Sequence, residues 1–140
     1  MDYKKFGNAY MVRINRGEEL VEKLMEFAKA EEIKLATVSG IGAADDVTIG
    51  VYSVEEQKYY QNTYQEELEL TSLAGNFSTM NGEEYVHLHA NFGRFDGSVV
   101  GGHLNKALIS GTSELVVQLL DGEVDRYKDD VTGLNLLDFS

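Results

Sequence analysis

The sequence predicts an α+β fold, in which a largely antiparallel sheet of many short strands packs with one main helix. Only the stretch from Leu20 to Ala28 repeats its apolar residues with a helical period. Most other stretches alternate apolar and polar residues, as strands with one buried face do. With 14 glycines and no proline, the turns must be made by Gly, Asn and Asp. At this length we expect residues 1–140 to form a single domain.

The first strand is predicted over residues 6–14, and the helix follows it directly. Asn15 is suited to cap the helix, and Glu18 three positions later can complete a capping box. The apolar stripe includes Leu20, Leu24 and Phe27, which are more typical of a core than of a cofactor site. We expect this helix to end near positions 31 and 32.

A glycine-containing run, Ser39-Gly40-Ile41-Gly42-Ala43-Ala44, invites comparison with phosphate-binding loops. Neither G-x-G-x-x-G nor G-x-x-x-x-G-K-[ST] occurs there, and no helix-forming run follows it. We therefore interpret this run as a connection between strands at 33–38 and 47–52. Residues 53–57 then form a hairpin loop that leads into another strand at 58–64.

The second half of the chain continues the pattern of strands and tight turns. A strand is predicted at 67–77, and Asn81-Gly82 is a strong turn signal before the next strand. Residues 104–109 continue a strand or begin another, and 112–120 form a strand rich in Val and Leu, which ends at an Asp121-Gly122 turn. The apolar tail at 132–139 is either the last strand of the sheet or part of a subunit contact.

All three histidines, His87, His89 and His103, lie in the stretch from Tyr85 to Asn105. Because side chains alternate along a strand, His87 and His89 share one face. Gly101 and Gly102 precede His103, where they leave room for a close approach or mark a bulge.

The turn before His103 decides whether the three imidazoles meet. Phe95-Asp96-Gly97 has the pattern of a three-residue hairpin loop with Gly97 in the left-handed position. This loop places His89 opposite His103 and His87 opposite Asn105, so that the imidazoles converge. A two-residue turn at 96–97 would instead shift the register by one and place His103 on the other face.

Three converging imidazoles are typical of a metal site with one open position. We predict that His87, His89 and His103 bind one transition-metal ion per chain, with zinc as the first choice and iron, cobalt or nickel as alternatives. The fourth ligand is water or a carboxylate, for which Glu69 and Glu114 are candidates; either could also act as a general base.

Asn91 and Asn105 are candidates for hydrogen bonds to the metal ligands. Two other interpretations stay open. In one, the histidines form ordinary hydrogen bonds on a polar sheet face. In the other, the chain is a cupin-like barrel, although the carboxylate expected shortly after the second histidine is missing, since only Asn91, Phe92, Gly93, Arg94 and Phe95 precede Asp96.

Charge bears on the possible partners. The chain has 24 acidic and 12 basic residues, and its net charge is −12. Affinity for a nucleic-acid duplex comes largely from clustered Lys and Arg, whereas the basic residues here are scattered along the sequence. No cysteine is present, which excludes disulfides and thiolate metal sites. No apolar run of membrane length and no signal-peptide pattern occurs, so we expect no membrane association and a cytoplasmic location.

The order of several motifs resembles the PPC domain, the plant-and-prokaryote conserved domain. The matching residues are Arg13 with Gly17-Glu18-Glu19-Leu20, Ser39-Gly40-Ile41-Gly42-Ala43, Glu69-Leu70-Thr71-Ser72-Leu73 before Gly75-Asn76, His87-Leu88-His89, Gly101-Gly102-His103-Leu104, and Thr112-Ser113-Glu114. The resemblance covers nearly the whole chain, and its histidine motifs are the most specific part. It implies an α+β domain, a homotrimer and, in some members, a metal at the histidine cluster.

The resemblance also carries a DNA-binding label, because the plant members join this domain to AT-hook motifs. This sequence lacks the Arg-Gly-Arg-Pro hook that reads the minor groove, so DNA is a doubtful partner. Three classes of function remain: a trimeric metal-binding protein, a metal-dependent enzyme that acts on a small molecule, and a DNA-associated scaffold or regulator. The sequence identifies no catalytic residue.

Overall fold

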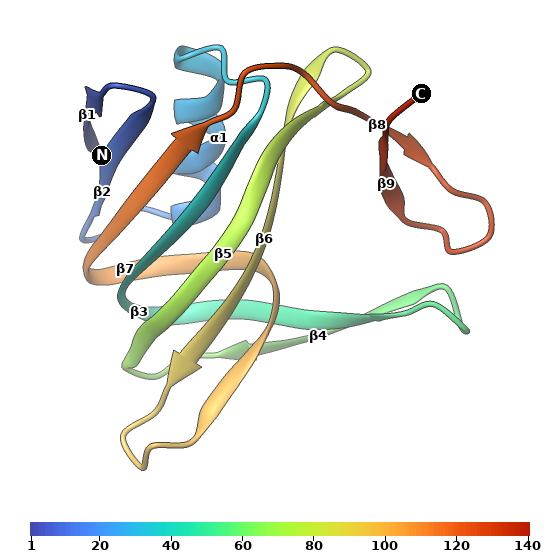
Figure 1. Ribbon diagram of the computed structural model, residues 1–140. Coiled ribbons are helices and arrows are strands. Elements are labelled where there is room, and N and C mark those ends of the chain that lie inside the picture. Colours follow the sequence, from blue (N-terminus) through green and yellow to red (C-terminus); the bar gives the residue numbers. More distant parts are fainter.

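The chain forms one helix and nine strands, most of which belong to a strongly bent antiparallel sheet (Figure 1). The computed structural model describes residues 1–140. Its elements are β1 (Asp2–Phe6), β2 (Ala9–Asn15), α1 (Leu20–Ala30), β3 (Ala36–Ser53), β4 (Lys58–Tyr64), β5 (Leu68–Met80), β6 (Glu83–Gly93), β7 (Val99–Leu119), β8 (Asp125–Lys128) and β9 (Asn135–Asp138). The predicted α+β class with a largely antiparallel sheet and one helix is therefore confirmed.

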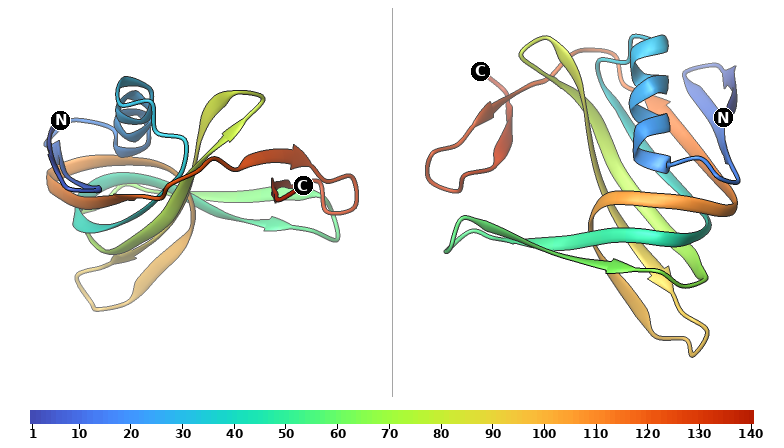
Figure 2. Two further views of the ribbon diagram at one scale, coloured as in Figure 1. Left: turned by 45° about the horizontal axis from the view of Figure 1, so that its top comes forward. Right: turned by 180° about the vertical axis from the view of Figure 1, so that it is seen from behind.

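The main sheet has the strand order β1-β2-β7-β6-β5-β3-β4, and β3 also pairs with β7. This additional pairing joins β7, β6, β5 and β3 into a closed ring. The two longest strands, β3 and β7, bend sharply, so that each serves two parts of the sheet (Figure 2). The first part of β3 lies between β5 and the end of β7, and its second part lies between β4 and the start of β7.

The glycine-containing run from Ser39 to Ala44 lies inside β3, so its prediction as a connection between strands is wrong. The strand continues through it with β-bulges on both sides of Gly42. A Cβ at Gly40 would lie 2.5 Å from the carbonyl oxygen of Glu114, and one at Gly42 would lie 2.6 Å from that of Thr112. The glycines therefore allow β3 and β7 to approach closely while the sheet bends, a packing need that the local pattern does not reveal.

The helix begins later than predicted, because Glu19 and not Asn15 is its N-cap. The Glu19 carboxylate accepts hydrogen bonds from the backbone N–H groups of Val21, Glu22 and Ala107. Gly17, at φ +84°, first turns the chain so that Glu19 can bridge to β7. Glu18 accepts a hydrogen bond from the Asn15 N–H at 2.8 Å, but this contact closes the turn that precedes the helix.

One face of α1 covers the sheet, as its apolar stripe predicts. Leu20, Leu24 and Phe27 are fully buried in a core of 25 residues. The Phe27 ring packs edge-on against Tyr10 and Phe77, at centroid distances of 5.1 and 6.4 Å, so it joins the helix to β2 and β5. The helix ends at Ala30 with Glu31 as its C-cap, next to the predicted end near positions 31 and 32.

Turns that contain Gly or Asn set several of the remaining boundaries, whereas Gln57, at φ +48°, completes the turn between β3 and β4. Gly7, at φ +60°, turns the chain between β1 and β2. The predicted strand at 6–14 therefore corresponds to β2, and β1 was not predicted. Asn81 and Gly82 both have positive φ and form the predicted turn between β5 and β6. The apolar tail does not join the main sheet, because β9 pairs only with β8 in a separate hairpin. The structure contains no helix that is both long and apolar enough to span a bilayer.

Candidate metal centre

The β6–β7 hairpin brings the three histidines together in the predicted register. Hydrogen bonds from the Arg94 N–H to the Ser98 carbonyl and from the Gly97 N–H to the Arg94 carbonyl, both 2.9 Å, close the three-residue loop. His89 consequently lies directly opposite His103. The ring centroid of His87 lies 5.0 Å from that of His89 and 5.3 Å from that of His103.

His103 lies where β7 changes partners. Before this residue β7 pairs with β6, and from His103 onward it pairs with β3, where Gly50 is its partner. A Cβ at Gly102 would lie 2.5 Å from the carbonyl oxygen of Gly50, so glycine permits both strands to meet β7 here. The sequence-based expectation that Asn105 lies opposite His87 is therefore wrong, because β7 has bent away from β6 by that point.

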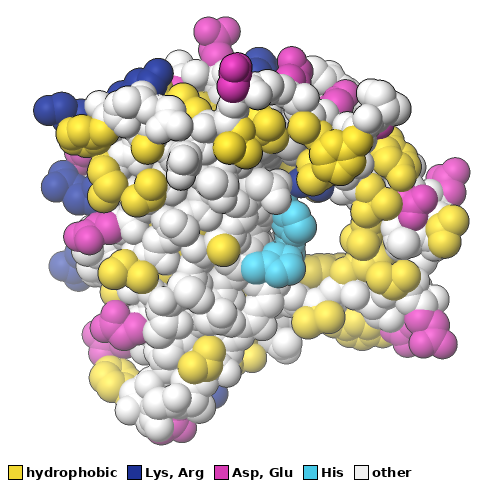
Figure 3. Space-filling view, in the orientation of Figure 1, with side chains coloured by type: hydrophobic (Ala, Val, Ile, Leu, Met, Phe, Trp, Pro, Cys, Tyr) yellow, Lys and Arg dark blue, Asp and Glu magenta, His cyan; other side chains and the backbone are white.

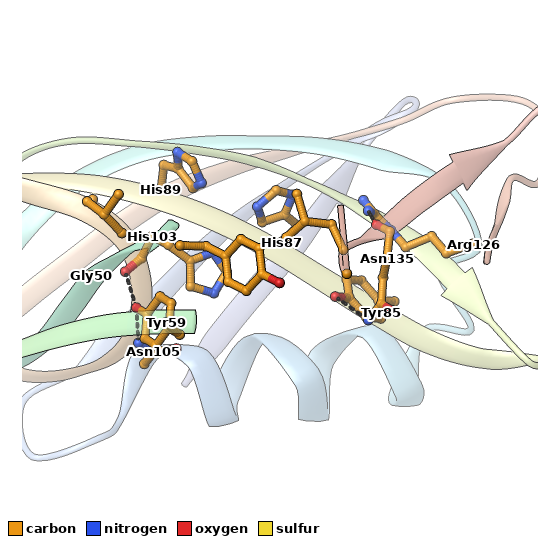
Figure 4. Close-up of a pocket in the computed structure, with 14 residues that line it drawn as sticks. Gly50, Tyr59, Tyr85, His87, His89, His103, Asn105, Arg126 and Asn135 are labelled. Atoms are coloured by element: carbon orange, nitrogen blue, oxygen red, sulfur yellow. Dashed lines mark hydrogen bonds between the residues drawn. The ribbon is translucent and has the colours of Figure 1, made fainter. Parts of the chain in front are cut away.

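The histidine geometry fits a metal ion. Each imidazole offers one nitrogen, and the three nitrogens lie within 4.8 Å of one another. Tetrahedral zinc with Zn–N bonds of about 2.0–2.1 Å needs nitrogens about 3.4 Å apart, so the imidazoles would have to turn toward one another when an ion binds. The side-chain hydrogen bond formed at these residues runs from the Tyr59 hydroxyl to the His103 carbonyl and not to an imidazole, so the interpretation as hydrogen-bonding histidines loses support (Figure 4).

The surroundings keep the imidazoles of His87 and His103 in the form that binds metals. Burial lowers the pKa of His87 to about 4, and repulsion by His103, His89 and Arg126 adds to this effect. Burial also lowers the pKa of His103, with a further contribution from His89. His87 and His103 are therefore neutral at pH 7, and a neutral imidazole presents a lone pair to a cation.

The two carboxylates considered as a fourth ligand lie elsewhere. Glu69, on β5, is paired with Ala43 of β3, and Glu114, on β7, is paired with Ile41. Both line a different pocket, beside the bulges of β3, and no carboxylate lines the pocket that contains the histidines. Asn91 does not line this pocket either, and its side chain donates a hydrogen bond to Ser72 Oγ at 3.0 Å.

The histidines form one wall of a hollow of about 650 Å³. In Figure 3 they are visible inside this hollow, and hydrophobic side chains line its far side. The walls come from β3, β4, β6 and β7 and from the segment that contains β8 and β9. A ligand bound to the histidines would therefore face a chamber large enough for a small molecule.

Several residues of this pocket were not predicted as site residues. The Tyr59 ring packs edge-on against His103, with 5.8 Å between the ring centroids. Asn105 donates a hydrogen bond to the Tyr59 hydroxyl. Asn105 thus lies near the histidines, as proposed, but contacts them through Tyr59. Tyr85 could have been found, since it precedes His87 by two positions on the same strand face. Arg126 on β8 has no local sequence signal that connects it with the histidines.

The bent sheet and the histidine cluster define a small α+β domain with a candidate three-histidine centre. The model of the Plants and Prokaryotes Conserved domain matches residues 1–121, and the chain belongs to this family, as the motifs indicated. No curated protein matches the sequence.

Three solved structures resemble the whole chain. A candidate DNA-binding protein from Bacteroides thetaiotaomicron is 38% identical, with 99% of this chain and 96% of that chain covered and a TM-score of 0.96. A metal-containing protein from Archaeoglobus fulgidus is 33% identical, with 98% of each chain covered and a TM-score of 0.86. A plant- and prokaryote-conserved protein from Pyrococcus horikoshii is 31% identical, with 98% of this chain and 94% of that chain covered and a TM-score of 0.86.

Proposed function

We propose that this protein binds one zinc ion per chain at His87, His89 and His103 and works as a homotrimer. The convergence of three imidazoles, whose nitrogens lie within 4.8 Å of one another, is the observation that carries the metal proposal. A related protein of known structure is described as containing a metal, which agrees with it. Iron, cobalt and nickel also bind imidazole, so the ion is to be identified by elemental analysis.

The trimer proposal is supported by apolar side chains on the outer face of the sheet. Met11 on β2 and Val116 on β7 are directly paired and are 49% and 39% exposed, and Ile41 on β3 is 57% exposed nearby. Such a patch on neighbouring strands is typical of a contact with another subunit. Light scattering coupled to gel filtration should give about three times the chain mass of 15.6 kDa. A monomer at micromolar concentration would contradict the trimer.

A metal-dependent enzyme is the second candidate function. The specific observation that favours it is the chamber next to the histidines, which gives a bound ion an open position facing a small-molecule space. Such an ion, when bound, supplies Lewis acidity toward a water or a carbonyl group. The chain itself contributes the aromatic walls and the orientation of His103 by Tyr59.

Elemental analysis of protein purified without a histidine tag tests the metal proposal. After incubation with zinc and removal of free metal, we expect about one zinc per chain. Protein that stays free of zinc, iron, cobalt and nickel at neutral pH would overturn the proposal.

A further inference from the structure

Arg126 is a buried cation that faces the same pocket. Its side chain is 7% exposed and donates hydrogen bonds of 2.8 Å to Ser78 Oγ, the Asn135 carbonyl and Asn76 Oδ1. The Tyr85 ring lies over the guanidinium at 4.6 Å. Figure 4 shows Arg126, Tyr85 and Asn135 together at one end of the pocket, beside His87.

The charge of Arg126 has no counter-ion in the chain. All three of its hydrogen-bond acceptors are neutral, and none of the ion pairs involves it. A guanidinium carries five N–H donors, so further donors remain for another group. Burial lowers the pKa of Arg126, as expected for a desolvated cation that no carboxylate compensates.

A purely structural role does not explain the charge. Arg126 does connect β8 to β5 and to β9, but neutral side chains could donate hydrogen bonds to the same neutral acceptors. Burying an unpaired cation is unfavourable, and pairing the charge with an anion offsets that cost. The guanidinium also presents its donors in a planar fork that matches both oxygens of a carboxylate.

The rest of the pocket suits an organic anion. The chain has 24 acidic residues, yet no Asp or Glu lines this pocket, and Arg126 is its one Lys or Arg. Tyr52, Tyr59, Tyr85 and Leu134 provide aromatic and aliphatic walls. An acidic protein that keeps one pocket free of carboxylates and places a buried arginine there favours a negatively charged ligand.

We propose that the pocket binds a small organic carboxylate, with the carboxylate on Arg126 and the apolar body against the tyrosines. This inference rests on the proposed function for its biological role, since the ligand would lie beside the metal ion. The recognition itself uses only residues of the chain, so metal-free protein should already bind such a ligand.

Calorimetric titration of wild-type protein with benzoate and with benzamide tests the proposal. The two probes have nearly the same shape, but only benzoate carries the charge that Arg126 would pair. We expect benzoate to bind at least about tenfold more tightly than benzamide, both in metal-free and in zinc-loaded protein. Equal affinities, or no benzoate binding in either form, would overturn the inference.

Two variants assign the effect to the arginine. Arg126→Lys keeps the charge but loses the fork, and we expect benzoate affinity to fall about tenfold while benzamide affinity stays unchanged. Arg13→Lys on the exposed face of β2 is the matched control and should leave the affinities for benzoate and benzamide unchanged. Benzoate binding that needs zinc and is insensitive to Arg126→Lys would overturn the inference while leaving the metal site intact. Benzoate binding with no zinc uptake would overturn the metal site alone.

Discussion

His89 on β6 and His103 on β7 lie directly opposite each other, with their ring centroids 5.6 Å apart. This pairing follows from the three-residue loop at 95–97, because a hairpin loop of defined length fixes which residues face each other. A register shifted by one would have placed His103 on the opposite face of the sheet. The candidate metal centre therefore depends on a short loop that does not contact it.

Replacing His89 by alanine should reduce the zinc content from about one ion per chain to near zero. Two imidazoles without a third ligand from the chain bind zinc much more weakly than three. Glu114→Ala is the matched control, because Glu114 lies in a different pocket, and it should keep its zinc. Elemental analysis measures both variants. Loss of zinc in Glu114→Ala, with zinc retained in His89→Ala, would place the ion elsewhere.

The metal-free protein should lose stability as the pH falls from about 6.5 to about 4. The pKa of His87 is lowered from 6.5 to about 4, first by burial and then by the neighbouring charges. In this interval the unfolded chain binds a proton that the folded chain does not, so acidification favours unfolding. The Tm in the presence of a chelator at pH 7.5 and pH 5 measures this loss. The Tm of the His87→Gln variant should fall less than that of the wild type over the same pH interval. Equal falls in Tm would show that His87 does not contribute to the pH dependence of stability.

Gly102→Ala should destabilise the fold and weaken zinc binding. Its Cβ would lie 2.5 Å from the Gly50 carbonyl oxygen, so β3 or β7 must move next to His103. We expect a loss of about 1–3 kcal/mol in the free energy of unfolding, measured by urea denaturation. Gly111→Ala on the same strand is the control, because its Cβ would meet nothing closer than Ala43 Cβ at 3.7 Å. If both variants behave alike, the close approach at Gly102 is not what positions His103.

Much of the site could be predicted because its determinants are local. The alternation around His87 and the loop at 95–97 placed the three imidazoles correctly. The expected pairing of His87 with Asn105 failed because β7 exchanges β6 for β3 at His103, a change that depends on the whole sheet. Arg126 escaped prediction for the same reason, since only the fold brings β8 next to β5 and the Arg126 side chain over Tyr85 of β6.

The fold shows a similar division between local and tertiary information. The stripe on α1 and the turn at Asn81-Gly82 were sufficient to predict the helix and a hairpin. The run from Ser39 to Ala44 looked like a connection because glycines usually interrupt strands. In the structure these glycines are required by the close contact with β7, which no local pattern encodes.

Duplex DNA should not bind this chain appreciably at physiological salt. The net charge is −12, and in Figure 3 the Lys and Arg side chains lie mostly along the edge near β1, with acidic side chains among them. Binding to a duplex draws most of its affinity from neutralising phosphates. Anisotropy titrations in about 150 mM salt, with A·T-rich duplexes included, measure the affinity of the chain for duplex DNA. A Kd below about 1 µM that weakens with added salt would contradict this prediction and show that the chain has a basic surface able to bind DNA.

A crystal structure of the zinc-loaded protein, with diffraction data collected at the zinc absorption edge, tests the central claim most directly. We expect one anomalous peak per chain between His87, His89 and His103, with Zn–N distances of about 2.0–2.1 Å. A peak beside Glu69 and Glu114, or no peak at the histidines in crystals grown with zinc at neutral pH, would contradict it.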